Sequence, residues 1–137
     1  METRLKLSAA TFRIAAFPND LMVLASPRLL TTTIINVLDN AMKYSNGPPD
    51  ITMKIEDSKK HVLIEVCDKG IGLNRKEAKR IFKRFYRASD PASHATPGTG
   101  LGLYFARLAI RAQGGNITVQ SAGLGLGTTF QIEIPKK

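Results

Sequence analysis

Two asparagines and a lysine share one face of a helix that the sequence predicts in its first third. Asn36, Asn40 and Lys43 stand at i, i+4 and i+7, so their side chains line up beside the apolar stripe of that helix. Asparagine is a poor former of helix interiors, so two on one face need a reason. Either the face is solvated, or it offers two amide oxygens to a hard cation, with the lysine facing the same anion.

A carboxylate ends the inward-facing row of a predicted strand. Counting by twos from Val62 arrives at Asp68, and a buried aspartate must be hydrogen-bonded or paired. Gly70 and Gly72 follow directly. The segment is either an ordinary turn at the end of a strand or part of a binding site.

A glycine-rich segment opens the last predicted helix. Residues 98–103 run Gly-Thr-Gly-Leu-Gly-Leu, and glycines with free N–H groups at the start of a helix suit a phosphate. The pattern matches the dinucleotide fingerprint poorly and has no Walker lysine-serine pair. In the last strand Thr128 shares a face with Phe130, where it either touches a ligand or packs.

The composition limits the classes of protein that remain. A chain of 137 residues fits one domain, and 43% hydrophobic with 23% charged residues is ordinary for a globular protein. The single cysteine, Cys67, excludes an internal disulfide framework. The net charge of +9 permits nucleic acid, anionic lipid or an acidic ligand as partner. Seven basic residues fall between Arg75 and Arg87, opposed only by Glu77, and a solvated helix face explains most of them equally well.

The hydrophobic periodicity supplies the elements that must position these groups. Helices are predicted from the Ser26 N-cap to about Tyr44, from the Asn74 capping box through Phe85, and over residues 101–113. Strands are predicted at 11–17, 21–25, 51–57, 61–68, 116–120 and 128–134, the first two joined by a turn, and residues 88–100 form a loop or lid. The predicted fold class is an α/β (α+β) two-layer sandwich, in which a mixed, mostly antiparallel sheet of about five strands carries three helices on one face.

Taken in this order, the segments resemble the ATP-binding catalytic domain of sensor histidine kinases, a family within the group of gyrase and heat-shock chaperone ATPases. The similarity covers about residues 12–135. It rests on an N box at 36–44, a first glycine box at 68–73, a phenylalanine box at 81–87, a second glycine box at 98–103 and a third at 125–130. The resemblance implies that residues 1–137 are one catalytic domain, excised from a longer kinase.

The resemblance also implies ATP and Mg²⁺ as cofactors and a role for each matched residue. Asn40 is the main magnesium ligand with Asn36 assisting, and Asp68 accepts a hydrogen bond from the adenine amino group. The other implied contacts are Lys43 to phosphate, Arg84 or Arg87 to the γ-phosphate, Tyr44 to ribose and base, Gly70 and Gly72 around the base, Gly98, Thr99, Gly100, Leu101, Gly102 and Leu103 over the phosphates, and Thr128 closing the adenine pocket.

One position separates a kinase from a hydrolase in this group. The hydrolytic members carry a glutamate four residues before the magnesium asparagine, where this sequence has Asn36. An amide cannot act as a general base, so transfer of the γ-phosphate to a histidine in trans is favoured over a self-sufficient ATPase. The complete phenylalanine box argues against a serine kinase of the anti-sigma type.

The phosphoacceptor is expected outside this chain. Neither His61 nor His94 stands in an acceptor-like motif, and no long helical hairpin precedes Thr11. The implied partners are a histidine-containing dimerisation domain of a homodimeric parent kinase and, indirectly, a response regulator of a two-component system. Nucleic acid is not expected, since Phe82 and Phe85 look like core residues. The domain is expected in the cytoplasm, with its parent either free or anchored in the inner membrane.

Overall fold

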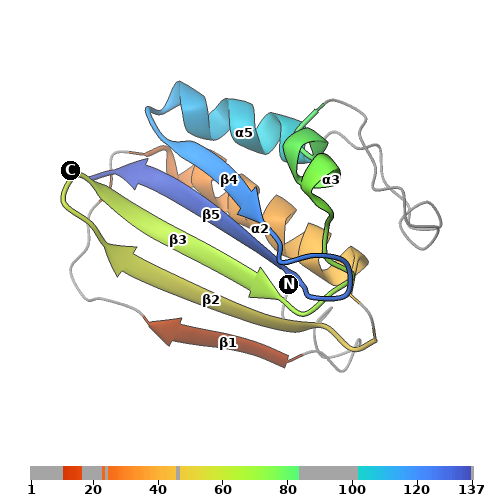
Figure 1. Ribbon diagram of the computed structural model, residues 1–137. Coiled ribbons are helices and arrows are strands. Elements are labelled where there is room, and N and C mark those ends of the chain that lie inside the picture. Colours follow the sequence, from red (N-terminus) through yellow and green to blue (C-terminus); the bar gives the residue numbers. More distant parts are fainter. Residues whose placement is uncertain (1–10, 17–22, 24, 46, 84–101, 137) are drawn as a thin grey trace.

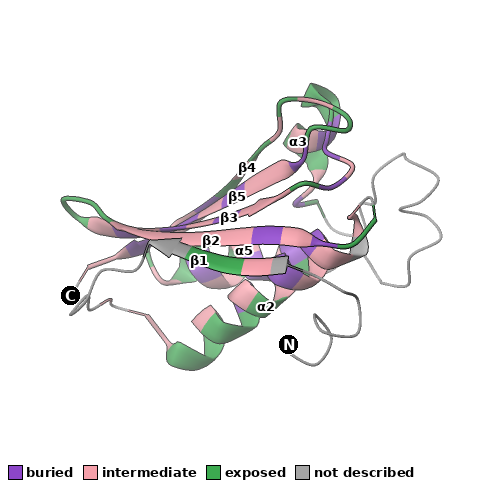
Figure 2. Ribbon diagram, turned by 90° about the horizontal axis from the view of Figure 1, so that it is seen from below, coloured by how far each residue is buried: buried purple, intermediate pink, exposed green. Residues whose placement is uncertain are grey.

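The structure, a computed structural model, describes residues 11–16, 23, 25–45, 47–83 and 102–136. In this part of the chain a five-stranded sheet carries two long helices, α2 (Pro27–Lys43) and α5 (Gly102–Ala112), on one face (Figure 1). The short helix α3 (Arg75–Arg80) lies at one end of the sheet. Seen from below, both long helices lie on the same side of the sheet (Figure 2), which confirms the predicted two-layer α/β fold.

The strand order in the sheet is β1-β2-β3-β5-β4. The strands are β1 (Thr11–Ala16), β2 (Asp50–Asp57), β3 (His61–Asp68), β4 (Asn116–Gln120) and β5 (Thr128–Pro135). Because β1 pairs with β2 in parallel and all other neighbours are antiparallel, the predicted mixed, mostly antiparallel sheet is confirmed. The ladder between β3 and β5 sets Asp68 opposite Thr128.

The strand predicted at residues 21–25 does not pair with β1 in the part of the chain that the structure describes. Thr11 of β1 lies opposite Asp50 of β2, and Val23 makes a single antiparallel bridge to Lys136. The parallel pairing is possible because α2 carries the chain back between β1 and β2, as a crossover connection must. Residues 17–22, which include the predicted turn, lie outside the described residues.

The helix α2 is fixed at its start by a cap and along its length by a buried stripe. Ser26 is the N-cap, and its Oγ accepts a hydrogen bond from the backbone N–H of Leu29 at 3.3 Å. Val37 and Ala41 are buried in the core. The predicted helix is confirmed, and the stripe fixes how α2 is turned about its axis, which in turn fixes the direction of its polar face.

The helix α3 begins as predicted but ends at Arg80, before the predicted end at Phe85, which lies outside the described residues. The backbone N–H of Lys83 donates to the carbonyl of Arg80 at 2.9 Å, so the chain turns there. This turn carries Phe82 into the core, where its ring meets that of Phe130 edge-on with the centroids 6.2 Å apart. The apolar stripe predicted for the helix therefore belongs partly to a turn.

The helix α5 confirms the third predicted helix. Its buried residues are Leu103, Ala106 and Ile110. Gly114 has a φ of +84°, the left-handed conformation that commonly ends a helix. The side-chain oxygen of Gln113 accepts the N–H of Ser26 at 2.5 Å, so the end of α5 contacts the start of α2 and the two helices are antiparallel neighbours.

Replacing Asn74 by Ala is expected to lower the free energy of unfolding by ~1 kcal/mol, because α3 loses its N-cap. Asn74 Oδ1 accepts the N–H of Glu77 at 2.8 Å, and Glu77 Oε1 accepts the N–H of Asn74 at 3.2 Å, so both halves of the capping box are present. Urea denaturation measures the change. Asn74→Ser keeps a capping oxygen and should stay close to the wild type. Equal losses in both variants would contradict the capping role.

Candidate nucleotide site

Three separate segments meet at the end of β3 that carries Asp68. Ile71, in the loop after β3, donates its backbone N–H to the carbonyl of Tyr44 at the end of α2, at 3.0 Å. The carbonyl of Ile71 accepts the N–H of Gly125, in the turn between β4 and β5, at 2.7 Å. This set of contacts, the Ile71 junction, joins the predicted N box, first glycine box and third glycine box through their backbones.

Two glycines beside the junction leave room for backbones that approach too closely for a side chain. A Cβ on Gly70 would lie 2.5 Å from the carbonyl oxygen of Tyr44. Gly72 has a φ of +69°, and a Cβ there would collide with the carbonyl oxygen of Gly123. Both positions therefore need glycine for the fold of the junction itself, in addition to the implied role of wrapping a base.

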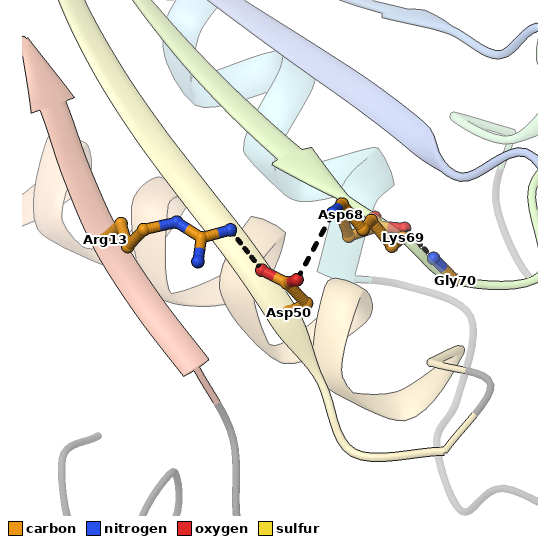
Figure 3. A network of polar contacts seen from close by, with 5 residues as sticks. All are labelled: Arg13, Asp50, Asp68, Lys69 and Gly70. Carbon is orange, nitrogen blue, oxygen red and sulfur yellow. Dashed lines mark hydrogen bonds and ion pairs between the residues drawn. The ribbon is translucent and has the colours of Figure 1, made fainter.

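Asp68 ends the inward-facing row of β3, as the alternation of the sequence predicts. Burial raises the pKa of its carboxyl from 3.8 to about 6, and hydrogen bonds from the backbone N–H groups of Gly70 and Thr128 oppose that rise. The bond from Gly70 to Oδ1 is 2.8 Å long (Figure 3). The carboxylate is therefore mostly ionised at neutral pH and acts only as an acceptor there.

Asp50, at the start of β2, holds the same loop from the other side (Figure 3). Its Oδ1 accepts a hydrogen bond from Arg13 Nη2 at 2.7 Å, and its Oδ2 lies 3.5 Å from Lys69 Nζ. Its carbonyl accepts the backbone N–H of Lys69 at 3.3 Å. Because exposed ion pairs contribute little each, the network serves mainly to join the edge strand β1 to the loop beside Asp68.

The N box and the second glycine box also meet. Asn36 Nδ2 donates a hydrogen bond to the carbonyl of Gly102 at 3.4 Å. A Cβ on Gly102 would lie 3.5 Å from Asn36 Oδ1, so the glycine faces the amide directly. Asn40 follows one helical turn further along α2 and is half-buried. The structure thus brings one predicted metal ligand against one predicted phosphate-binding residue.

Several predicted site residues lie outside what the structure describes. They are Arg84, Arg87, Gly98, Thr99, Gly100 and Leu101, together with the side chain of Lys43. Leu103 is described, and its side chain is buried in the core. The nucleotide contacts that the resemblance implies for these residues stay predictions.

A pocket of about 830 Å³ opens between α3 and the turn that joins β4 to β5. Asp68 and Thr128 both line it. Its other lining residues are Leu73, Asn74, Arg75, Ala78, Gln120, Ser121, Ala122, Gly123, Leu126, Gly127 and Thr129. This pocket adjoins the predicted adenine contacts and not the predicted metal ligands, since neither Asn36 nor Asn40 is among its lining residues.

Ser121 is a residue of this region that sequence analysis missed. Its Oγ accepts the N–H of Leu73 at 3.0 Å and that of Gly123 at 3.2 Å, and it donates to the carbonyl of Gly127 at 2.6 Å. One hydroxyl thus ties the turn between β4 and β5 to the first glycine box. The available signal was its place just before a glycine-rich turn, where serine hydroxyls often bond to the backbone.

Comparison with known proteins assigns the chain to a family. Residues 25–137 match the family model described as histidine kinase-, DNA gyrase B- and HSP90-like ATPase. Because the match covers most of the chain, the chain belongs to this ATPase family. The resemblance drawn from the motifs is confirmed, and family membership implies ATP binding.

Proteins similar to this chain include sensor histidine kinases. The sensor-like histidine kinase SenX3 of Mycolicibacterium smegmatis is 35% identical over 119 residues, which are 87% of this chain and 31% of SenX3. The solved structure of the mycobacterial sensor histidine kinase MprB has a TM-score of 0.85 and 25% identity, covering 99% of this chain and 91% of that chain. Full-length ShkA in complex with AMPPNP has a TM-score of 0.82 and 25% identity, covering 99% of this chain and 27% of that chain.

The chain spans about a third or less of curated relatives that it matches, with shares of 31%, 13% and 20% of the lengths of three of them. Among the helices that the structure describes, none has both the length and the apolar character needed to cross a bilayer.

Replacing Asp68 by Asn is expected to stabilise the ligand-free protein at neutral pH. The raised pKa means that the folded state holds the proton more tightly than the unfolded state, so the free energy of unfolding falls as the pH rises from 3.8 to about 6. Asparagine removes the charge and keeps an oxygen for the N–H of Gly70. Because the side chain is only partly buried, we expect a gain of ~1–2 kcal/mol above that window.

Urea denaturation at neutral pH and near pH 4 measures this gain, which should largely disappear at the lower pH. Asp57→Asn makes the same chemical change at an exposed position at the far end of β2, where it removes only a surface ion pair with Lys136, and serves as the control. An equal effect of Asp68→Asn at both pH values would show that burial of the charge is not the cause.

Proposed function

We propose that this domain binds ATP with Mg²⁺ and transfers the γ-phosphate to a histidine on a separate dimerisation domain, in two-component signal transduction. The observation that carries the proposal is the position of the Asp68 carboxylate, which lines the pocket, accepts the N–H of Gly70 at 2.8 Å and lies opposite Thr128 in the sheet. A group that only accepts hydrogen bonds suits the amino group of adenine. The complex of ShkA with AMPPNP supports the same class of nucleotide for this chain.

The polar face of α2 fits a magnesium ion that arrives with the nucleotide. Asn36 and Asn40 offer neutral amide oxygens, and the described residues include no group of three or more His, Cys, Asp or Glu that could hold a metal ion. Magnesium is usually bound by a few protein ligands together with the phosphates of a substrate. We therefore assign Asn40 and Asn36 to the metal, which when bound neutralises charge on the phosphates.

The remaining roles follow from the position of each residue in the motifs. Lys43, Arg84 and Arg87 would place positive charge near the transferred phosphoryl group, where charge develops in the transition state. Tyr44, whose carbonyl is part of the Ile71 junction, would contact ribose and base. Thr128 would close the adenine pocket beside Asp68.

Direct transfer is favoured over hydrolysis by the residue at position 36. Asn36 donates to the carbonyl of Gly102 and cannot take a proton from water, because an amide is not a base at neutral pH. His61 begins β3, whose other end is Asp68, and seven strand steps separate the two by ~24 Å. This separation favours an acceptor histidine on another domain. The parent protein would be a homodimer that passes the phosphate to a response regulator.

The wild-type chain is expected to bind ATP·Mg²⁺, and Asp68→Asn should weaken binding by ~1.5–3 kcal/mol, because a hydrogen bond to a charged group is lost. Isothermal titration measures both affinities. Asp57→Asn is the matched control and should bind like the wild type. Unchanged affinity in Asp68→Asn would refute the adenine contact, and the stability measurement described above shows that any loss is not due to unfolding.

Radiolabelled ATP should label a separately purified dimerisation domain with an acceptor histidine, and should leave the isolated chain almost unlabelled. Losing the domain that positions the acceptor removes an advantage of ~7–11 kcal/mol. Asn40→Ala should abolish labelling of the added domain while both proteins remain folded. Acid-labile, base-stable label on the isolated chain would make His61 or His94 an acceptor and would overturn the transfer in trans.

A further inference from the structure

The helix α3 and the turn after it carry an unbalanced basic surface. The α3 basic face consists of the exposed residues Arg75, Lys76, Lys79, Arg80 and Lys83. The acidic residue of this helix, Glu77, is only 5% exposed, and its carboxylate accepts the N–H of Asn74. Among the described residues, the ion pairs lie elsewhere and join Arg13 and Lys69 to Asp50, Lys54 to Glu56, and Lys136 to Asp57.

This arrangement is unfavourable for the helix itself. Like charges at spacings of three and four residues, such as Lys76 with Lys79 and Arg80, repel one another. Arg75 stands in the first turn, where the helix dipole favours anions and disfavours cations. Lys79 and Arg80 stand in the last turn, where the dipole favours cations, so the unfavourable features are the mutual repulsion of the cations and the position of Arg75. An anion outside the helix would relieve both.

The α3 basic face borders the candidate site at its first residue. Arg75 lines the same pocket as Asp68 and Thr128. At a rise of ~1.5 Å per residue, the charges from Arg75 to Arg80 are spread along only ~8 Å of helix axis. That distance is comparable with the Debye length of ~8 Å at physiological ionic strength, so the field of the whole helix reaches an anion at the pocket.

We infer that the α3 basic face steers the anionic nucleotide toward the site and sets its association rate. The inference rests on the proposed binding of ATP, whose triphosphate is the anion. Surface charges that remain outside the final contacts act on the approach of a ligand more than on its departure. Charged clefts raise association rates by ~10–1000-fold, in a manner that salt suppresses.

The chain offers a control set of cations that should not steer. Lys59 and Lys60 are exposed in the turn between β2 and β3, at the opposite end of β3 from Asp68. The length of that strand places them ~27 Å away, several Debye lengths from the pocket. Arg28 is exposed in the first turn of α2, ~22 Å along the axis from Lys43. Removing these three cations changes the net charge by the same amount as removing three cations from the α3 basic face.

The experiment compares Lys76→Gln/Lys79→Gln/Lys83→Gln with Arg28→Gln/Lys59→Gln/Lys60→Gln. Stopped-flow fluorescence with a labelled ATP analogue gives the association and dissociation rates over a range of salt concentrations. We expect the α3 variant to lose ~3–10-fold in association rate at low salt, with a flatter salt dependence and a dissociation rate within ~2-fold of the wild type. The control variant should keep an association rate within ~2-fold of the wild type at every salt concentration.

Adenosine, which lacks the phosphates, separates steering from damage to the pocket, and all three proteins should bind it equally. An α3 variant that binds ATP as fast as the wild type would overturn the inference and leave the proposed function intact. Equal slowing in both variants would assign the effect to net charge and would also overturn it. Normal association with ATP but weaker labelling of the dimerisation domain would assign the α3 basic face to the protein partner instead. A wild-type chain that binds neither ATP nor adenosine would refute the proposed function itself.

Discussion

Two backbone hydrogen bonds on one residue, Ile71, hold the candidate site together. Its N–H is bonded to the carbonyl of Tyr44 and its carbonyl to the N–H of Gly125. Each such bond contributes only ~1 kcal/mol, but leaving a partly buried backbone group without a partner costs more than the bond contributes. The end of α2, the loop after β3 and the turn between β4 and β5 are therefore fixed relative to one another. This close approach requires glycine at positions 70 and 72, because a Cβ at either position would collide with a backbone carbonyl oxygen.

Features that depend on residues close together in the chain could be predicted from the sequence. The N-caps Ser26 and Asn74 were identified because a capping residue and the helix that it starts are adjacent in the chain. The alternation along β3 placed Asp68 on the inner face, since side chains on one face of a strand recur every second residue. The motifs, taken in order, gave the family. The hairpins β2–β3 and β4–β5 could be predicted because short turns separate their strands.

Features that depend on distant partners could not be predicted. Nothing near β1 in the sequence specifies β2 as its parallel neighbour, so the prediction followed the nearest apolar run, at residues 21–25. The same holds for the contact of Asp50 with Arg13, and for Arg107, whose guanidinium lies 4.7 Å from the ring centroid of Phe82. Each pair is brought together by the sheet or by the packing of α5, and neither residue alone shows its partner.

The chemistry of Asp68 depends on a balance that the junction sets. Burial removes competing water, which strengthens any hydrogen bond to the carboxylate, but it also favours the proton and raises the pKa. The N–H groups of Gly70 and Thr128 limit that rise, so that the pKa reaches only about 6. Deeper burial without these donors would leave a neutral acid at pH 7, which would offer an O–H to an amino group that itself needs an acceptor. A more exposed position would let water take the place of the ligand. Gly70 can lie close to Tyr44 only because it has no side chain, and its N–H donates to Asp68 Oδ1. The same glycine therefore permits the junction and helps to keep Asp68 an acceptor.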